Sequence, residues 1–371
     1  MITRRAFARH VGGVVSAMPW AGEAFLAHRA MARVVPRSGM ISLDSNENPA
    51  GPFPAALEAI KQGAADTARY HFEEFGAFAE RLARSEDLKP DQVLFGVGSS
   101  EILSAAICAF TSAALPMITA VPTFEIPMEF ARSLGHKTIE IPLTGSWAFP
   151  VKRLAQEADR AGGGLIYLSN PNNPTSSLTP NADLAWLASN LPANTVLLVD
   201  EAYIQFTDPS RVTSALDYVR RNQNVVVTRT FSKIYGMAGA RVGFGCGRPD
   251  LVRSILTFKD NVIPILGLRA ATAALGEAAI IVPKRRAEMT RIRGELCSWL
   301  REKGVSYIEP HANFLMIDIR RDVRSFGPAM FRKGVAVGRP FPPLDQMLRV
   351  TIGTDQEMAR FRETFWQVYS A

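Results

Sequence analysis

At 371 residues the chain is long enough for about two domains with a large buried core, and its 47% apolar composition is typical of a soluble globular protein. Lys and Arg outnumber Asp and Glu, 42 to 35, but they are scattered, which argues against a nucleic-acid partner and leaves a basic pocket for a small anion. The three cysteines lack a CxxC pair, the five histidines lack ligand spacing, and no apolar run reaches about 18 residues, so neither a metal centre nor a membrane span is expected.

Residues 1–32 have the features of an export signal. Paired arginines, Arg4 and Arg5, precede a weakly apolar stretch at residues 11–21, and Ala30-Met31-Ala32 is a small-x-small cleavage site. This pattern resembles a twin-arginine signal, so we expect export to the periplasm, with no membrane contact afterwards. The alternatives are an amphipathic helix, or an arm around a partner subunit, of a cytoplasmic protein.

Two segments follow, an N-terminal segment at residues 33–69 and a large domain at residues 70–265. The first contains a Pro- and Gly-rich lead-in and then a helical composition at residues 55–65. In the second, short apolar runs alternate with longer helical patterns. The predicted strands are residues 93–97, 116–121, 164–169, 195–200 and 224–228. This alternation predicts an α/β fold, with a mainly parallel sheet covered by helices on both faces.

The pattern changes in residues 266–371, which we expect to form a smaller α+β domain joined by the N-terminal segment. A long charged helix is predicted from Pro283 to Lys303. The predicted strands after it are residues 305–307, 312–318, 334–337 and 347–352.

Lys233 is the most informative residue of the chain. It follows the apolar run at residues 225–229, so it lies in a loop just past a strand, where open α/β sheets bind ligands. Hydroxyls and small residues surround it, and Arg241 follows eight positions later. This setting suits an amine that condenses with a phosphorylated aldehyde. Taken alone, a lysine is usually a solvated surface charge.

Three loops between predicted elements carry further candidates. Gly96–Glu101 leads into a helix whose free N–H groups suit a phosphate, although a glycine turn with a serine cap is the alternative. Asn170–Thr175 offers an amide donor, or only a structural turn. Pro122–Phe124 offers a ring to stack on a flat heterocycle, or only a core residue.

Two charged residues interrupt apolar strands. Asp200 closes the most apolar strand of the chain, and a carboxylate there needs a partner such as a protonated ring nitrogen, unless it is a helix cap. Tyr203 follows it and could bond the oxygen of the same ring. Arg349 lies within Leu348–Ile352 and needs an anion, either a substrate carboxylate or the partner in a buried structural salt bridge.

In this order, the segments resemble the class I/II pyridoxal-phosphate-dependent aminotransferases of fold type I, and most closely the histidinol-phosphate aminotransferase group. The resemblance extends from Leu43–Pro49 to Arg349–Thr354, nearly the whole chain after the export signal. It implies a large cofactor-binding domain, a smaller domain that closes over the substrate, and pyridoxal 5′-phosphate as the cofactor.

The resemblance also implies a role for each site residue. Lys233 corresponds to the Schiff-base lysine, Asp200 to the carboxylate that pairs with the pyridinium nitrogen, and Arg349 to the arginine that binds the substrate carboxylate. Asn173 and Tyr203 correspond to the ligands of the phenolate oxygen, and Asn173 also faces the substrate. The stacking aromatic corresponds to Phe124, and the tyrosine from the partner subunit corresponds to Tyr70. The phosphate ligands correspond to Ser99, Ser100, Thr230, Ser232 and Arg241.

By this resemblance the chain is an aminotransferase that moves an amino group between an amino acid and a 2-oxo acid in a ping-pong reaction. It implies a homodimer in which Tyr70 completes the phosphate site of the other subunit. The alternatives are a decarboxylase, lyase or cyclase that uses the same cofactor on an amino acid, and a non-catalytic sensor with the same fold.

Four departures from the family pattern concern the substrate. Ala50 replaces a tyrosine, Ser176 replaces a glycine, and His71 replaces a proline. Where the substrate is phosphorylated, an arginine directly follows the Gly-Val-x-Val run, whereas here Gly338 stands in that position and Arg339 comes one later. We therefore expect a substrate other than histidinol phosphate.

Overall fold

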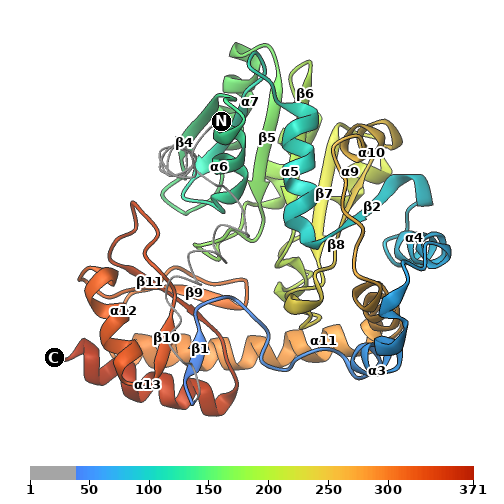
Figure 1. Ribbon diagram of the computed structural model, residues 1–371. Coiled ribbons are helices and arrows are strands. Elements are labelled where there is room, and N and C mark those ends of the chain that lie inside the picture. The colour runs from blue at the N-terminus through green and yellow to red at the C-terminus, as the bar shows by residue number, and fades with distance from the viewer. Residues whose placement is uncertain (1–38) are drawn as a thin grey trace, which may run out of the picture.

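The computed structural model describes residues 39–371, and the predicted export signal at residues 1–32 lies outside them. The described chain forms a larger part around a central sheet and a smaller part beside it. The helix α11 (Ile265–Glu302) extends along the base of both parts (Figure 1).

The larger part is built on a seven-stranded sheet with the order β2-β8-β7-β6-β5-β3-β4. All neighbouring strands are parallel except those paired with β8, which runs antiparallel to β2 and β7. The predicted α/β fold with a mainly parallel sheet is confirmed. Its strands are β2 (Val93–Gly96), β3 (Met117–Val121), β4 (Thr138–Pro142), β5 (Gly164–Ser169), β6 (Thr195–Asp200), β7 (Val225–Thr230) and β8 (Gly243–Gly247).

Helices cover both faces of this sheet because its central strands are apolar on both sides. Leu165 and Tyr167 of β5 pack in one apolar cluster, whereas Ile166 and Leu168 pack in the other. The first face is covered by α5 (Gly98–Phe110), α6 (Ile126–Ser133) and α10 (Pro249–Leu256). The second is covered by α4 (Glu73–Ser85), α7 (Val151–Arg160), α8 (Asn181–Ser189) and α9 (Leu216–Arg220).

Four parallel neighbours, β3, β5, β6 and β7, bring their carboxyl ends to one edge of the sheet. They end at Val121, Ser169, Asp200 and Thr230, and the loops that follow carry most of the predicted site residues. Ligands of open α/β sheets bind at such an edge. The topology therefore gathers side chains that are far apart in the sequence.

The smaller part combines both ends of the described chain. β1 (Ile41–Leu43) pairs in parallel with β10 (Val335–Val337), and β9 (Phe314–Asp318) pairs antiparallel with β11 (Met347–Thr351). α12 (Val323–Arg332) and α13 (Asp355–Tyr369) pack together beside them. The N-terminal segment thus contributes a strand here, while the domain boundaries at residues 70 and 266 stay predictions.

The predicted start of the long helix is wrong. The helix begins at Ile265 rather than at Pro283, which lies inside it. A proline costs about 3 kcal/mol in a helix interior because it removes a backbone donor, so the sequence favoured a start at that residue. The helix continues because its apolar residues pack against α3 (Pro54–Gly63), where an added Cβ at Gly63 would lie 3.0 Å from Leu266. Tertiary packing overrides the local preference.

Within residues 39–371, α11 is the one helix that is long and apolar enough to cross a membrane by length and composition. Its buried residues Leu268, Ala271 and Leu296 belong to the main apolar cluster. We interpret it as a core helix that links the two parts.

The remaining differences concern short strands. The strand predicted at residues 305–307 is wrong, because there only Tyr307 forms a bridge, with Ile317. β1, β4 and β8 were not predicted. The glycines of β8 lower its β-propensity, but they allow close packing, since an added Cβ at Gly245 would lie 3.0 Å from Ile102.

Candidate active site

Lys233 lies in the loop after β7, at the carboxyl edge of the sheet. Its Nζ donates to the backbone oxygen of Ser45 (3.4 Å) and lies 5.5 Å from the centroid of the Tyr203 ring. Both partners are uncharged, so the amine is held weakly. A weakly held amine at a ligand-binding edge is suited to bond covalently to a carbonyl group.

Asp200 is a buried carboxylate held by neutral donors. It accepts hydrogen bonds from the Ala202 amide (3.2 Å), the Thr228 hydroxyl (3.3 Å) and the Tyr167 hydroxyl (3.3 Å). Burial raises its pKa to about 6 although these bonds act in the opposite direction. A cation beside this carboxylate would relieve the cost of its ionisation. The site thus fits a protonated ring nitrogen.

Tyr203 connects this edge to the N-terminal segment. Its hydroxyl accepts a hydrogen bond from Asn46 Nδ2 (3.2 Å), and its ring packs edge-on against Phe314 at 4.9 Å. Asn46 is fixed in turn by Thr351, whose hydroxyl accepts from its backbone N–H (2.9 Å). Three distant segments therefore hold the Tyr203 hydroxyl in place.

The start of α5 forms a cradle for an anion. Gly98 has a φ of +74°, and an added Cβ there would overlap the guanidinium of Arg241. An added Cβ at Gly243 would overlap the backbone nitrogen of Ser99. The N–H groups of a helix start and a guanidinium thus lie close together, which fits a phosphate group.

The hydroxyls of Thr230, at the end of β7, and Ser232, in the loop after it, lie at the same edge of the sheet as the start of α5. Thr230 Oγ1 accepts from the backbone N–H of Ser232 (3.0 Å) and donates to its Oγ (2.9 Å). β8, which pairs with β7, brings Gly243 beside Thr230. Ser99 and Ser232 are therefore positioned from two sides, by α5 and by the β7–β8 pair.

Arg349 is the clearest candidate for binding a carboxylate. It is 8% exposed, and it donates to Asn173 Oδ1 (2.8 Å) and to the Asp44 backbone oxygen (2.7 Å). Its Nε is buried without a hydrogen-bond partner in the described part of the chain. Burial lowers its pKa to about 10, so it remains cationic at neutral pH. None of these partners is a carboxylate, so the expected alternative, a buried salt bridge, is not what the structure shows.

The loop that carries Asn173 is bonded to the loop after β3. Asn172 Nδ2 donates to the Pro122 oxygen (3.0 Å), and the Thr123 hydroxyl donates to Asn172 Oδ1 (2.7 Å). Phe124, next in the chain, is half-buried against the apolar cluster under α5 and α6. The amide and the aromatic side chain predicted to contact a ring thus come from adjacent loops.

Tyr70 differs from the other predicted residues. Its ring is 71% exposed and stacks on Phe72 at 5.1 Å. It lines a 270 Å³ hollow together with Arg69 and Val262. An exposed tyrosine beside a hollow is what a residue destined for another subunit requires.

Sequence reasoning missed residues that act through long-range contacts. Tyr167 and Thr228 bond Asp200, and Ser176 bonds the smaller part, yet none lies in a recognisable motif for that role. Asn46 lies within Leu43–Pro49, a segment that carries the family resemblance but predicts no contact with Tyr203.

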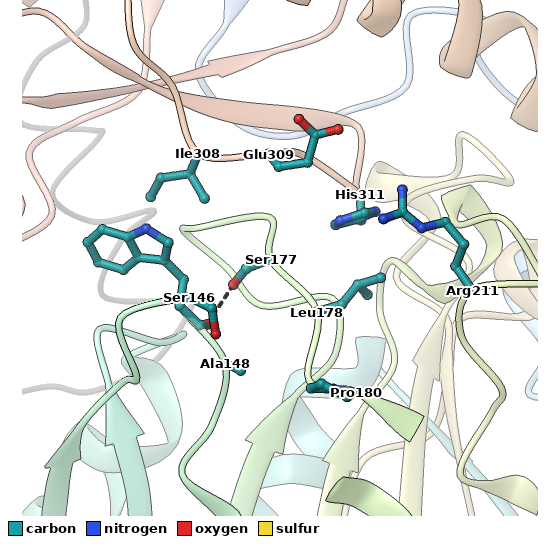
Figure 2. A pocket seen from close by; sticks show the side chains of 10 residues that line it. Ser146, Ala148, Ser177, Leu178, Pro180, Arg211, Ile308, Glu309 and His311 are labelled. Carbon is teal, nitrogen blue, oxygen red and sulfur yellow. Dashed lines mark hydrogen bonds between the residues drawn. The ribbon is translucent and has the colours of Figure 1, made fainter. Parts of the chain in front are cut away.

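A separate cavity of 380 Å³ lies between the two parts (Figure 2). Trp147 and Arg211 line it from the larger part, and Glu309 and His311 from the smaller part. Burial, with Arg211 and Arg293 nearby, lowers the pKa of His311 to about 4, so this imidazole is neutral at pH 7. The cavity contains none of the predicted site residues.

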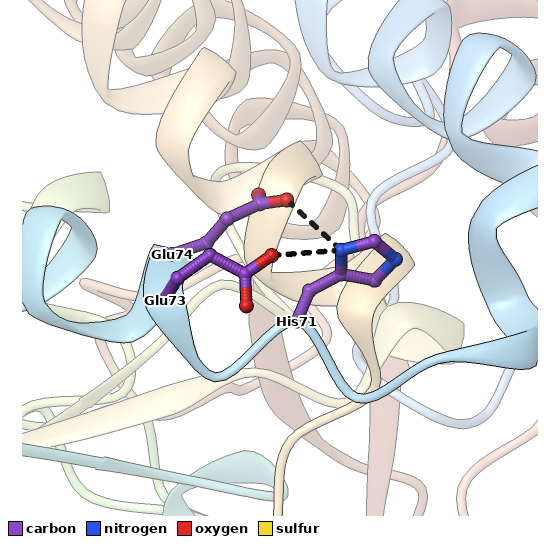
Figure 3. A group of neighbouring side chains, drawn as sticks. All are labelled: His71, Glu73 and Glu74. Atoms are coloured by element: carbon purple, nitrogen blue, oxygen red, sulfur yellow. Dashed lines mark hydrogen bonds and ion pairs between the residues drawn. The ribbon is translucent and has the colours of Figure 1, made fainter.

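His71, Glu73 and Glu74 converge at the start of α4, with ligand atoms within 4.8 Å of one another (Figure 3). His71 Nδ1 lies 3.1 Å from Glu73 Oε1, and Arg269 pairs with Glu74 at 2.6 Å. Because a guanidinium already occupies the carboxylate that a metal ion would need, we interpret the group as an ion-pair network.

Comparisons with known proteins agree with this geometry. Residues 38–365 match the family model of aminotransferase class I and II. A histidinol-phosphate aminotransferase of Symbiobacterium thermophilum is 34% identical over 87% of this chain and 89% of its own. Among solved structures, a putative histidinol-phosphate aminotransferase of Erwinia carotovora atroseptica has a TM-score of 0.86 and 29% identity over 90% and 98% of the two chains. A histidinol-phosphate aminotransferase of Sinorhizobium meliloti, in complex with pyridoxal-5′-phosphate, has a TM-score of 0.81 and 25% identity over 89% and 91%.

Proposed function

The chain belongs to the class I and II aminotransferase family, and we propose that its amino donor is an amino acid rather than histidinol phosphate. The family, the fold, the aminotransferase reaction between an amino acid and a 2-oxo acid, and pyridoxal 5′-phosphate as cofactor are confirmed. The matching relatives are aminotransferases, which favours this reaction over a decarboxylase, lyase or cyclase.

The proposed assignment of the cofactor site follows the geometry. The start of α5 with Ser99, Ser100 and Arg241, and the hydroxyls of Thr230 and Ser232, would hold the phosphate. Asp200 would pair with the ring nitrogen, Asn173 and Tyr203 would bond the ring oxygen, and Phe124 would stack on the ring. Bound there, the cofactor would withdraw electrons from the substrate Cα.

The residues of the chain would then divide the work. Arg349 would bind the α-carboxylate and so orient the Cα–H bond. The amine of Lys233 would take the proton from the substrate Cα and pass it to the C4′ carbon of the cofactor. Asp200 would keep the ring nitrogen protonated, and for this its carboxylate must be ionised.

The buried Arg349 carries this proposal, because within residues 39–371 its Nε has no hydrogen-bond partner and its other nitrogens donate only to an amide and a backbone oxygen, so the guanidinium can bind an anionic ligand. We expect Arg349→Gln to raise KM for amino acids about a hundredfold, since a paired charge-assisted contact is lost. Arg293→Gln is the matched control, because Arg293 is partly buried and also donates to a backbone oxygen, that of Ala312 (2.8 Å). An unchanged KM in Arg349→Gln would refute the assignment.

The choice of donor can be tested directly. Gly338 stands where the group with a phosphorylated substrate carries an arginine, which supports a donor without a phosphate. Purified enzyme would be offered a panel of amino acids and histidinol phosphate with 2-oxoglutarate as acceptor. We expect amino acids to give the higher kcat/KM. Preference for histidinol phosphate would reverse this part of the proposal.

The proposed working unit is a homodimer that is exported. Its exposed Tyr70 supports a contribution to the neighbouring site. Export rests on the paired Arg4 and Arg5 and the segment up to Ala32. Mass analysis of the mature protein should find an N-terminus after Ala32, and lysines at both arginine positions should retain the protein in the cytoplasm. An intact N-terminus in both cases would favour the cytoplasmic alternative.

A further inference from the structure

The segment after β10 has no side chain at the position nearest to the carboxylate site. The backbone N–H of Gly338 donates to the Arg349 oxygen (2.9 Å). An added Cβ at Gly338 would lie 2.7 Å from that oxygen and 2.9 Å from Arg349 Cβ. Position 338 therefore cannot carry a cation unless the strand moves. The cation that this segment does supply is Arg339, the next residue.

Arg339 and Arg349 contact the same aromatic ring. The guanidinium of Arg339 lies 4.1 Å from the centroid of the Phe341 ring, and that of Arg349 lies 4.6 Å from it. Phe341 is buried in a small apolar cluster with Ile308 and Met316, so the ring is a fixed spacer. A second guanidinium is thus held about one ring away from the carboxylate site.

Glu125 of the larger part already pairs with Arg339 of the smaller part. The two side chains are 26% and 45% exposed. Glu125 directly follows Phe124, the ring proposed to stack on the cofactor, and its loop is bonded to Asn172, the neighbour of Asn173. The pair therefore bridges the two parts beside both the cofactor site and the carboxylate site.

The exposure of this pair decides what it can do. A partly exposed ion pair is weak in water, so it exchanges partners easily. With Glu125 in place, the charge of Arg339 is neutralised, and an uncharged substrate side chain meets no unpaired cation. A side-chain carboxylate can instead replace Glu125 on Arg339, and Glu125 is then left to water.

We propose that Glu125 and Arg339 form an exchangeable charge pair that lets one site take both uncharged and acidic amino acids. Arg339 is the specificity-determining residue for the side-chain carboxylate, and Glu125 neutralises it when that carboxylate is absent. This inference rests on the proposed function, because Arg349 must hold the α-carboxylate for the substrate side chain to lie beside Arg339.

The test uses two unreactive competitors with the cofactor-loaded enzyme, so that binding is read without turnover. Succinate carries two carboxylates and butyrate carries one on a chain of the same length. We expect Arg339→Gln to raise the inhibition constant of succinate about tenfold and that of butyrate less than about twofold. We expect Glu125→Gln to lower the inhibition constant of succinate by up to about fivefold, because the carboxylate that competes for Arg339 is removed. Arg339→Gln should likewise raise KM for glutamate and leave KM for an uncharged amino acid nearly unchanged.

The ion pair of Arg132 and Glu140 is the matched control, because it also joins α6 to a neighbouring segment and its side chains are 51% and 28% exposed. Arg132→Gln should leave both competitors unchanged. Equal effects of Arg339→Gln on succinate and butyrate, or no effect on either, would overturn the charge-pair proposal. Arg349→Gln distinguishes this from failure of the proposed function, since it should weaken both competitors. If it weakens neither, the carboxylate assignment itself fails.

Discussion

Asp200 is a buried carboxylate that only neutral groups bond, and this setting favours a cationic ligand. The residue is 4% exposed, and the three hydrogen-bond donors to its carboxylate are an amide and two hydroxyls. Neutral donors only partly replace the hydration of an ion. The pKa of about 6 follows from that shortfall. A ring nitrogen that carries a proton would supply the missing positive charge.

The stability of the cofactor-free protein should therefore depend on pH through Asp200. Its folded-state pKa lies above the unfolded value, so the stabilisation is fully present below about pH 4 and is lost as the pH rises through about 6. The loss amounts to about 3 kcal/mol, from about 1.4 kcal/mol for each pKa unit. Urea unfolding from pH 4 to 8 should show this slope in the wild type and lose most of it in Asp200→Asn. Equal slopes in the two proteins would count against it.

Lys233→Ala tests the residue that the proposed reaction cannot do without. Loss of the proton carrier should reduce single-turnover rates by about a thousandfold or more. Borohydride reduction followed by mass spectrometry should find the cofactor attached to the wild type and not to the variant. Lys152→Ala, on α7 with its amine over the Trp186 ring, is the control and should keep both properties. An attached cofactor in Lys233→Ala would place the covalent bond on another residue.

At the scale of elements, Ser176 ties the loop after β5 to the smaller part. It is fully buried, and its φ is +60°. Its hydroxyl accepts hydrogen bonds from the backbone N–H groups of His311 (3.0 Å) and Ala312 (2.8 Å). Three residues away, Asn173 bonds Arg349 across the same boundary. These two ties hold the cofactor loop and the carboxylate site in one arrangement.

Two substitutions at this position separate the hydroxyl from the backbone. Ser176→Ala loses the acceptor and keeps the left-handed strain, so we expect a loss of about 1–3 kcal/mol in the free energy of unfolding. Ser176→Gly also loses the acceptor but regains about 1 kcal/mol by relieving the strain. Urea unfolding should rank the wild type first, glycine second and alanine last. KM for the amino acid should rise in both variants, and an unchanged KM would show that the tie does not reach Arg349.

Elements defined by a continuous apolar run were predictable from the sequence. β5 and β6 have the predicted bounds because each is a buried run between turn residues. β8 was missed because its glycines carry no pattern, and the start of α11 was missed because packing against α3 outweighs the signal of Pro283. Hydrophobic periodicity and secondary-structure propensity describe one segment by itself, whereas β8 and the start of α11 form because of the elements that pack against them.

The candidate site divides in the same way. Lys233, Asp200 and Arg349 could be named because each is a charge at or within an apolar strand. The groups that bond Asp200 could not be named, because Tyr167 and Thr228 reach its carboxylate only after the strands have paired. Motifs thus identify the reacting groups, and the fold supplies the hydrogen bonds that set their charge and orientation.

At the scale of the whole molecule, exposed apolar side chains gather near the predicted subunit contact. Tyr70 and Phe72, whose rings stack, are 71% and 60% exposed, and Val262 is 43% exposed. Tyr70 and Val262 line the same hollow of 270 Å³. Large exposed apolar groups that lie together mark an interaction surface. A second copy of the chain is the occupant that would also bring Tyr70 to a cofactor site.

Hybrid dimers test this arrangement without depending on the stability of either variant alone. Lys233→Ala removes the reacting amine from its own subunit, and Tyr70→Phe removes a hydroxyl from the neighbouring site. In a mixed dimer one site carries both defects and the other carries neither. Because a symmetric dimer has two equivalent sites, co-refolding equal amounts should restore about a quarter of the wild-type activity. If Tyr70 served its own subunit, every site in the mixture would keep one defect, and no activity beyond the sum of the separate variants would appear.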